Sequence, residues 1–355
     1  MVKSIFMIFY YLSFICSVCI PKKEFEAESK AHIGDTTFDD IISFFNVLGK
    51  GTFGKVYKMK WDNQKAALKR QIARDFFDVI SIGREARILE KLKGVPGVVQ
   101  LHSCMVEGKE YFFVFERMES DLKESRRAFQ SLTLSRRINF YKQLAFALAE
   151  IHERGIVHND FKPANVMSKD EEFNGPKIID FGMSCEMNDP NKYDCQGGSP
   201  GFSSPEKLNS ENSNTNFAPS DKTDVWAFLL TIADIEKKGI FFYTNFYDEV
   251  KDECYEKDYS QKCFEDLIKS IKTIFEEDNA VLLEFVLSNL KYLSSERKKM
   301  WDLGKELQIL EIQDKSFNIK NLPLNDFTLG EKYQGKSLVE FREHLDQINN
   351  KFIFI

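Results

Sequence analysis

The sequence predicts an α+β fold of two lobes, in which a small β-rich N-terminal lobe precedes a larger helical C-terminal lobe. Between residues 44 and 118, short runs rich in Val, Tyr and Phe alternate with turns that contain Gly or Asn, a pattern typical of strands. Beyond residue 119, apolar residues mostly recur every three to four positions, which is typical of helices. Hydrophobic residues make up 43% of the 355 residues, so the chain can bury a sizeable core and is not globally disordered.

The charge balance narrows the classes of partner. The formal net charge is −6, which argues against nucleic acid or an anionic membrane surface as the main partner. An acidic protein that binds a phosphorylated ligand instead needs local positive charge or metal ions at its site.

The N-terminal segment differs in composition from the rest of the chain. Residues 1–20 contain one lysine followed by an uncharged apolar run, and the small residues Ser17 and Cys19 lie near its end. This composition predicts a secretory signal peptide or an N-terminal membrane anchor, and hence a protein of the secretory pathway or one associated with a membrane. A buried core helix in a cytoplasmic protein is the alternative. Residues 21–43 are polar and charged, which predicts a linker.

The elements can be placed in order along the chain. Residues 44–70 predict strands, residues 78–93 predict a helix, and two further strands flank a turn at Gly108. Thr133 can cap the long helix that follows, and residues 209–220 predict a polar loop. Helical periodicity covers the ranges 133–153, 221–237, 260–276, 279–294, 297–310 and 336–350.

The first motif that carries chemistry is LGKGTFGKVYK, in which Gly49, Gly51 and Gly54 follow Leu48 in a GxGxxG pattern. The strand-like residues KVYKMKW come after the last glycine, whereas a dinucleotide-binding motif would begin a helix there. Glycines in a strand–turn–strand unit let backbone N–H groups approach phosphate oxygens, because no Cβ interferes. Taken alone, the motif is also compatible with an ordinary glycine-rich hairpin.

A lysine and a glutamate follow this motif at a useful spacing. Lys69 lies in the strand-like stretch AALK and could contact nucleotide phosphates if a carboxylate held its ammonium group. Glu85, in the next predicted helix, is the candidate partner. Two unrelated surface charges are the alternative.

The stretches HNDFKPAN and KIIDFG hold the other polar residues of a phosphoryl-transfer site. Asp160 can accept the proton of an acceptor hydroxyl, and Lys162 can neutralise charge on the transferring group. Asn165 and Asp180 offer oxygen atoms to Mg²⁺, which prefers such ligands. A polar turn explains either stretch alone, but the order and spacing of all the motifs together favour phosphoryl transfer.

These motifs resemble those of the eukaryotic protein kinases, clearly from residue 44 to 235 and weakly beyond it. The resemblance implies a protein-kinase-like bilobal fold over residues 44–350, divided between residues 118 and 119, with ATP and Mg²⁺ as cofactors. It implies the nucleotide contacts Leu48, Gly49, Gly51, Gly54, Val56, Ala67, Lys69, Glu116, Met118, Asp121 and Met167. It also implies a stack of Leu89, Leu101, His158 and Phe181 that couples the lobes, and an Asp224 that holds the catalytic-loop backbone.

The resemblance extends to the substrate. Lys162, two residues after Asp160, follows the serine/threonine kinase pattern, and the hydroxyl of Ser199 can contact both of them. The sequence is therefore similar to an active kinase for protein Ser/Thr acceptors, with Lys69, Glu85 and Asp160 among its catalytic residues. The alternatives are a catalytically weak pseudokinase that acts as a nucleotide-binding scaffold and a kinase for small molecules.

Asn159 and the missing partner of Glu206 depart from the family pattern. Asn159 stands where the family has an arginine that pairs with an activation-loop phosphate, so activity is expected not to need that phosphate. No arginine can be assigned as the usual partner of Glu206.

A disulfide between Cys185 and Cys195 would clamp the activation segment, although two reduced cysteines are the preferred interpretation. Loss of residues 1–20 would leave five of the seven cysteines, and an odd number does not indicate a disulfide framework.

Overall fold

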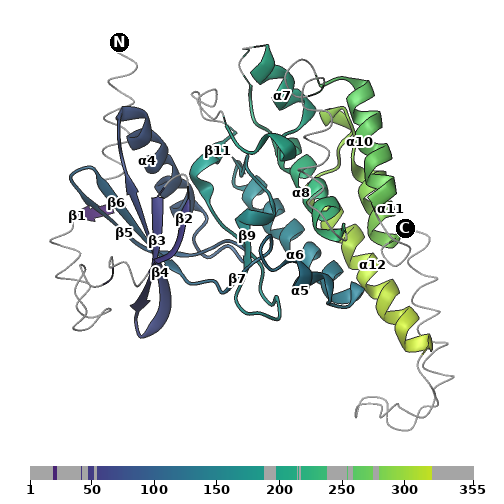
Figure 1. Cartoon of the computed structure of the whole chain (residues 1–355), viewed down its shortest axis with the longest axis horizontal. Helices are drawn as coiled ribbons and strands as arrows, with labels where there is room; N and C mark the ends of the chain where they lie inside the picture. Colours follow the sequence, from purple (N-terminus) through teal and green to yellow (C-terminus); the bar gives the residue numbers. More distant parts are fainter. Residues whose placement is uncertain are drawn as a thin grey trace, which may run out of the picture.

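The computed structural model of the chain has two lobes, a sheet with one flanking helix and a larger helical part (Figure 1). This is the α+β bilobal architecture that the sequence predicts, and the prediction is confirmed. The structure describes residues 19–21, 41, 47–51, 54–187, 197–213, 215, 217–237, 254, 259–274 and 280–321.

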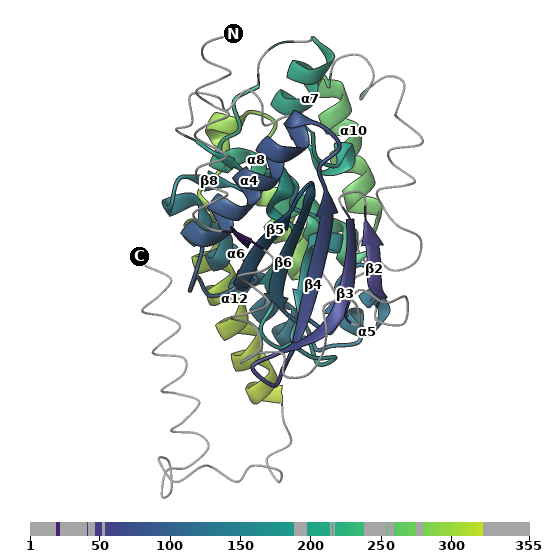
Figure 2. The same ribbon diagram turned by 90° about the vertical axis from the view of Figure 1, so that its left-hand side faces the viewer.

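The N-terminal lobe is a six-stranded sheet in the order β1-β5-β6-β4-β3-β2. Its strands are β1 (Cys19–Pro21), β2 (Val47–Gly51), β3 (Gly54–Trp61), β4 (Gln64–Ile72), β5 (Leu101–Glu107) and β6 (Glu110–Glu116). Strands β2 to β6 pair antiparallel, whereas β1 pairs parallel with β5. Figure 2 shows β2 to β6 side by side, with α4 (Phe76–Lys91) next to them.

Local sequence explains the two tight turns of this sheet. Asp62 and Asn63 join β3 to β4 with φ of 49° and 59°, and such left-handed backbone suits a two-residue hairpin turn. Asp and Asn tolerate this conformation better than most side chains. Gly108, with φ of 58°, lies in the turn predicted between β5 and β6.

Side-chain alternation gives the sheet two different faces. Val56 pairs with Lys69, and Ala67 precedes Lys69 by two residues, so these three side chains share one face. The other face carries a separate apolar cluster, made of Ile41, Tyr57, Met59, Ala66, Leu68, Met105, Phe112 and Val114. The register therefore places Lys69 on the face away from this cluster.

Helix α4 begins two residues before its predicted start, directly after a capping aspartate. The side chain of Asp75 accepts a hydrogen bond from the backbone N–H of Asp78 at 3.0 Å, which satisfies one of the unpaired amides of the first turn. Helix α4 buries Ile82, Ala86 and Leu89. The same helix also buries Glu85.

The C-terminal lobe is mostly helical. Its helices are α5 (Arg126–Gln130), α6 (Leu134–Glu153), α7 (Pro205–Asn212), α8 (Asp221–Glu236), α10 (Gln261–Ile274), α11 (Ala280–Asn289) and α12 (Met300–Asn321). Thr133 caps α6, as predicted, and accepts from the N–H of Arg136. Short strands carry the site loops: β7 (Ser120–Asp121), β8 (Ile156–Val157), β9 (Val166–Ser168), β10 (Lys177–Ile178) and β11 (Cys185–Glu186).

Two boundary predictions need correction. The predicted loop at residues 209–220 is shorter, because α7 continues to Asn212. The helix predicted at residues 297–310 begins at Met300 and extends to Asn321. The helix predicted at 336–350 lies outside the described residues.

The N-terminal prediction is only partly within the described residues. Cys19 and Ile20, assigned from sequence to the apolar leader or anchor, belong to β1 at the edge of the sheet. The interpretation of these two residues as a removable or membrane-embedded end is therefore corrected, while residues 1–18 lie outside the described part. Among the described residues, no helix combines the length and the apolar character needed to cross a membrane.

The preferred interpretation, reduced cysteines without a disulfide framework, was wrong for the described cysteines. Cys19 forms a disulfide with Cys104, and Cys254 forms one with Cys263. Cys185 is also disulfide-bonded, whereas Cys195, its candidate partner from sequence, lies outside the described residues. Sequence spacing could not show the first pair, because β1 reaches Cys104 only once it joins β5.

Candidate active site

The glycine motif forms the hairpin of β2 and β3. Gly51 pairs with Gly54, and Leu48 at the start of the motif is 43% exposed. Gly54 has φ of 149°, and a Cβ added there would lie 2.0 Å from the backbone oxygen of Arg70. A side chain is thus excluded at Gly54, because the backbone of β4 lies too close to the start of β3. Gly49 shows no such restriction, since a Cβ there would meet nothing within 4 Å.

The predicted adenine contacts come from both lobes. Val56 and Ala67 are half-buried on the cleft-facing side of the sheet, and Met167 is half-buried on β9. Met167 pairs with Asp121 of β7, so the two C-lobe residues predicted to contact the nucleotide are neighbours. Apolar side chains from two lobes that remain partly exposed are suited to cover a flat ring.

The side chains of Glu116, Met118 and Asp121, which are predicted to contact the nucleotide, have structural surroundings of their own. The carboxylate of Glu116 accepts from the N–H of Gln100 at 2.9 Å and pairs with Lys177 at 3.1 Å. Met118 is 8% exposed. The Oδ1 atom of Asp121 accepts two backbone N–H groups of the following turn, and burial raises the pKa of this carboxyl. The side chain of Glu116 therefore stabilises the fold through Gln100 and Lys177, and that of Met118 packs in the interior.

A chain of ion pairs crosses the cleft. The ammonium of Lys69 donates to Glu85 at 2.7 Å and to Asp180 at 3.1 Å, so β4, α4 and the C-lobe meet at one nitrogen. Burial by itself would lower the pKa of Lys69, but the two carboxylates outweigh it and hold that pKa well above its usual value. The Lys69 ammonium, in turn, lowers the pKa of Asp180. Lys69 and Asp180 are therefore both charged at neutral pH.

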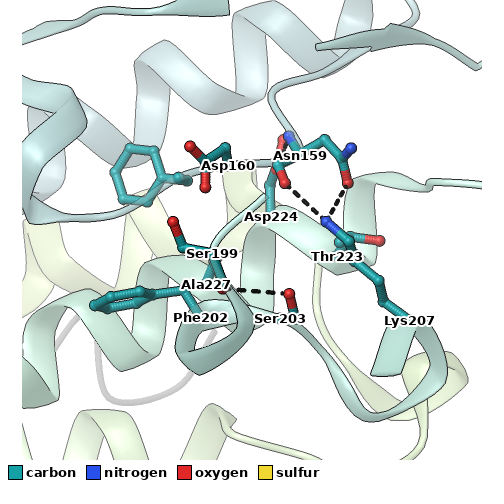
Figure 3. A pocket seen from close by; sticks show the side chains of 10 residues that line it. Asn159, Asp160, Ser199, Phe202, Ser203, Lys207, Thr223, Asp224 and Ala227 are labelled. Atoms are coloured by element: carbon teal, nitrogen blue, oxygen red, sulfur yellow. Dashed lines mark hydrogen bonds between the residues drawn. The ribbon is translucent and has the colours of Figure 1, made fainter. Parts of the chain in front are cut away.

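The two carboxylate oxygens of Asp160 differ in their hydrogen bonds. Asp160 lies in the stretch HNDFKPAN, residues 158–165, which is called the catalytic loop below. Its Oδ2 atom accepts from Lys162 at 2.8 Å and from Asn165 at 3.1 Å. Its Oδ1 atom is buried and has no hydrogen-bond partner among the described residues. Lys162 also donates to Ser199 Oγ at 2.6 Å, the contact expected from sequence, and Figure 3 shows Ser199 close to Asp160.

The predicted metal ligands have suitable chemistry. The amide nitrogen of Asn165 donates to Asp160, which leaves its amide oxygen for a cation. Asp180 has a left-handed backbone with φ of 62°, a conformation that non-glycine residues often show at functional sites. Within the described ranges, no group of three or more His, Cys, Asp or Glu side chains is arranged for a metal ion. One carboxylate and one amide oxygen fit Mg²⁺, which usually completes its shell with phosphates and water.

Asp224 holds the backbone of the catalytic loop from below. Its carboxylate accepts the N–H of His158 at 2.8 Å and that of Asn159 at 2.9 Å, and contacts the ring of His152 at 2.8 Å. Burial would raise the pKa of Asp224, but these hydrogen-bond donors lower it overall. The ring of His158 lies 5.0 Å from that of Phe181, and these are the two C-lobe members of the predicted stack.

Comparison with known proteins agrees with this geometry. Residues 42–304 match the family model for the protein kinase domain. This chain belongs to the protein kinase family. Its relatives include serine/threonine-protein kinases, and the predicted family is confirmed.

The kinase is similar to several characterised proteins over part of their length. It is 32% identical to death-associated protein kinase dapk-1 of Caenorhabditis elegans over 215 residues, which are 57% of this chain and 14% of that protein. It is 29% identical to serine/threonine-protein kinase cds1 of Schizosaccharomyces pombe over 229 residues, 61% of this chain and 48% of the relative. It is 33% identical to serine/threonine-protein kinase pim-2 of Danio rerio over 190 residues, 47% and 60% of the two chains. The kinase thus spans less than two thirds of each of these relatives.

The structure supplies the arginine that sequence analysis could not assign. Arg297 donates to both oxygens of Glu206, at 2.7 and 2.8 Å, and its guanidinium lies 5.0 Å from the ring centroid of Trp226. The Arg297 side chain is fully buried. Arg297 is 91 residues from Glu206 in a basic stretch, SERKK, and only the path of the chain singles it out.

A second missed contact joins α4 to the activation segment. Glu186 of β11 pairs with Arg87 at 2.8 Å and also with Lys91, one helical turn further along α4. Because Glu85 lies on the same helix, these ion pairs help to hold it beside Lys69. The spacing of Arg87 and Lys91 at i and i+4 is a sequence signal for a shared partner, although it does not reveal which one.

Proposed function

We propose that this kinase is catalytically active and transfers the γ-phosphoryl group of ATP to Ser or Thr hydroxyls of protein substrates. The observation that carries the proposal is the asymmetry of Asp160. Lys162 and Asn165 hold one carboxylate oxygen, while the other is buried with no hydrogen-bond partner among the described residues. A buried acceptor without a partner costs free energy, and a substrate hydroxyl would relieve that cost.

The residues have separable tasks in this reaction. Asp160 Oδ1 accepts the proton of the acceptor hydroxyl and orients its oxygen for attack. Lys162, held between Asp160 and Ser199, places positive charge where negative charge develops. Asn165 and Asp180 would hold Mg²⁺, and Lys69 the phosphates. Bound Mg·ATP supplies the phosphoryl group and neutralises much of its charge.

The preference for Ser and Thr rests on the residues around Asp160. Lys162 contacts Ser199, which lies near the end of the activation segment. The sequence around Ser199 resembles that of serine/threonine kinases. Serine/threonine kinases also occur among the relatives of the chain.

The test is transfer of labelled γ-phosphate from Mg·ATP to a mixed Ser/Thr protein substrate by the full chain. Wild type is compared with Asp180→Ala, and with Asp266→Ala as a control on the exposed surface of α10. Transfer by wild type and by the control, lost in Asp180→Ala, is the expected result. Nucleotide binding without transfer in wild type would instead identify a pseudokinase that acts as a scaffold.

We further propose that the kinase acts in an oxidising compartment of the secretory pathway. Support comes from the two disulfides, Cys19–Cys104 and Cys254–Cys263, because such bonds are rare in the reducing cytosol. The test is thiol alkylation of cell-derived protein before reduction, followed by peptide mass spectrometry. Unlabelled Cys104 and Cys263 are expected, whereas their full alkylation would place the protein in the cytoplasm. A lumenal kinase would also need imported ATP.

A further inference from the structure

Lys207 is a buried lysine beside the catalytic loop. It lies in the first turn of α7, and its side chain is 1% exposed. Figure 3 shows the side chain reaching from α7 to the catalytic loop. There its ammonium donates to the main-chain oxygen of Asn159 at 3.1 Å and to Asn159 Oδ1 at 2.9 Å. Asn159 is the residue immediately before Asp160.

Asn159 connects four parts of the C-lobe. Its main-chain N–H donates to Asp224 at 2.9 Å, and its side-chain amide donates to the main-chain oxygen of Met183 at 3.1 Å. Met183 opens the activation segment directly after the Asp-Phe-Gly motif. Together with Lys207, these bonds link the catalytic loop to α7, to α8 and to the activation segment. Asn159 also has a left-handed backbone with φ of 64°, so its conformation depends on these partners.

The C-terminal end of the activation segment also contacts Lys207 and Asn159. Gly198 has φ of 113°, and a Cβ added there would lie 2.7 Å from Lys207 Nζ and 2.8 Å from the main-chain oxygen of Asn159. The segment therefore passes directly over the Lys207–Asn159 contact. The next residue is Ser199, whose hydroxyl accepts from Lys162. Both ends of the activation segment thus meet the catalytic loop at Asn159.

Core packing does not explain a lysine at this position. Burial lowers the pKa of Lys207, and the carboxylates of Glu211, Asp160 and Asp224 oppose that effect. A methionine of similar length would fill the space without loss of hydration, since buried charges are more costly than apolar groups of the same volume. Instead of apolar contacts, its ammonium makes two hydrogen bonds to Asn159, the residue before Asp160.

We propose that Lys207 is a positioning residue for Asp160, which acts through Asn159 and joins the activation segment to the catalytic loop without a phosphate. The proposal rests on the proposed kinase activity. Because the joining groups are a lysine and an amide of the chain itself, the acceptor half of the site is assembled as soon as the chain folds. Lys207 touches neither ATP nor the acceptor, so its effect is on the rate of transfer and not on nucleotide affinity.

The test compares Lys207→Met, Lys207→Arg and Lys142→Met in steady-state kinetics with Mg·ATP and a mixed Ser/Thr protein substrate. Lys142 pairs with Glu311 between α6 and α12, outside the site, and its variant controls for the loss of a partly buried lysine. We expect Lys207→Met to lower kcat about 10²-fold, the effect of a small misplacement of a catalytic group, with KM for ATP unchanged. Lys207→Arg should recover part of the rate, and Lys142→Met should keep it.

Two additions make the test specific. The double variant Asn159→Ala/Lys207→Met should lose no more than the stronger single variant, because both changes break one connection. Phosphatase treatment should leave the wild-type rate unchanged.

Each contrary outcome has a defined meaning. An active wild type with an unchanged kcat in Lys207→Met overturns the positioning role alone. A fall in rate that follows a fall in melting temperature does the same, since it marks a purely structural lysine. Loss of wild-type activity on phosphatase treatment overturns the phosphate-independent connection. No transfer by wild type removes the proposed function, and the role of Lys207 with it.

Discussion

The two halves of the candidate site are built in different ways. The nucleotide half joins Lys69 and Glu85 of the N-terminal lobe to Asp180 of the C-terminal lobe through ion pairs. The acceptor half lies within the C-terminal lobe, where Asp160 and Asn159 are held mainly by hydrogen bonds to nearby loops and helices. The first half therefore depends on how the lobes align, and the second on how the activation segment packs. Changes in each half should alter different kinetic constants.

The largest effect is expected at the centre of the acceptor half. Asp160→Asn keeps the shape of the side chain but removes the proton acceptor, so kcat should fall about 10³-fold. KM for ATP should remain close to the wild-type value, because the Lys69–Glu85–Asp180 chain is intact. Steady-state kinetics with varied ATP measures both constants. A large rise in KM for ATP would show that the halves are not separable.

A change in the nucleotide half should act mainly on KM for ATP, whereas Asp160→Asn acts on kcat. Glu85→Gln removes the charge that holds the Lys69 ammonium, although an amide oxygen can still accept one hydrogen bond. We expect a loss of about 10²-fold in kcat/KM for ATP, with much of it in KM. Fluorescent nucleotide binding provides an independent measure of affinity. If kcat alone changed, Glu85 would belong functionally to the acceptor half.

A third variant tests the support under the acceptor half. Arg297→Met leaves Glu206 without its bidentate partner, and breaking such a pair at a buried arginine costs about 3 kcal/mol of unfolding free energy. Denaturant unfolding should show this loss, while nucleotide affinity at low temperature stays unchanged. An unaltered midpoint would mean that the packing of α7 does not depend on Arg297.

The smallest effect concerns pH. Lys69 holds the pKa of Asp180 below its usual 3.8, so the folded state retains the ionised form to lower pH than the unfolded chain does. This stabilisation is present above pH 3.8 and is lost as the pH falls through the folded-state pKa. The stability difference between wild type and Asp180→Asn should therefore be constant near neutral pH and shrink in acid.

Asp121 provides the matched control for this pH effect. Burial raises the pKa of Asp121, so its ionised form destabilises the folded state. That cost is relieved as the pH falls and the carboxyl is protonated, whereas the stabilisation from Asp180 is lost as the pH falls. Urea unfolding of wild type, Asp180→Asn and Asp121→Asn between pH 3 and 7 covers both cases. Equal pH trends for the two variants would contradict the assignment of Lys69 as the cause.

Much of the nucleotide half could be predicted from sequence, because local rules govern it. Glycine spacing marks the hairpin of β2 and β3, and period-2 alternation assigns Val56 and Lys69 to one face. Helical periodicity places Glu85 on the buried side of α4. In the acceptor half, a short motif brings Asp160 and Asn165 into one loop, five positions apart. Each of these inferences needs only neighbours in the chain.

The sequence by itself determined the bilobal fold class, the order of the motifs and the residue types suited to phosphoryl transfer. Only the tertiary structure decided which distant groups meet. Lys207 reaches Asn159 across 48 residues, Arg297 reaches Glu206 across 91, and Cys19 reaches Cys104 across 85. Such contacts depend on the path of the whole chain, since a side chain interacts with whatever packing brings within a few ångströms, whatever its distance in sequence.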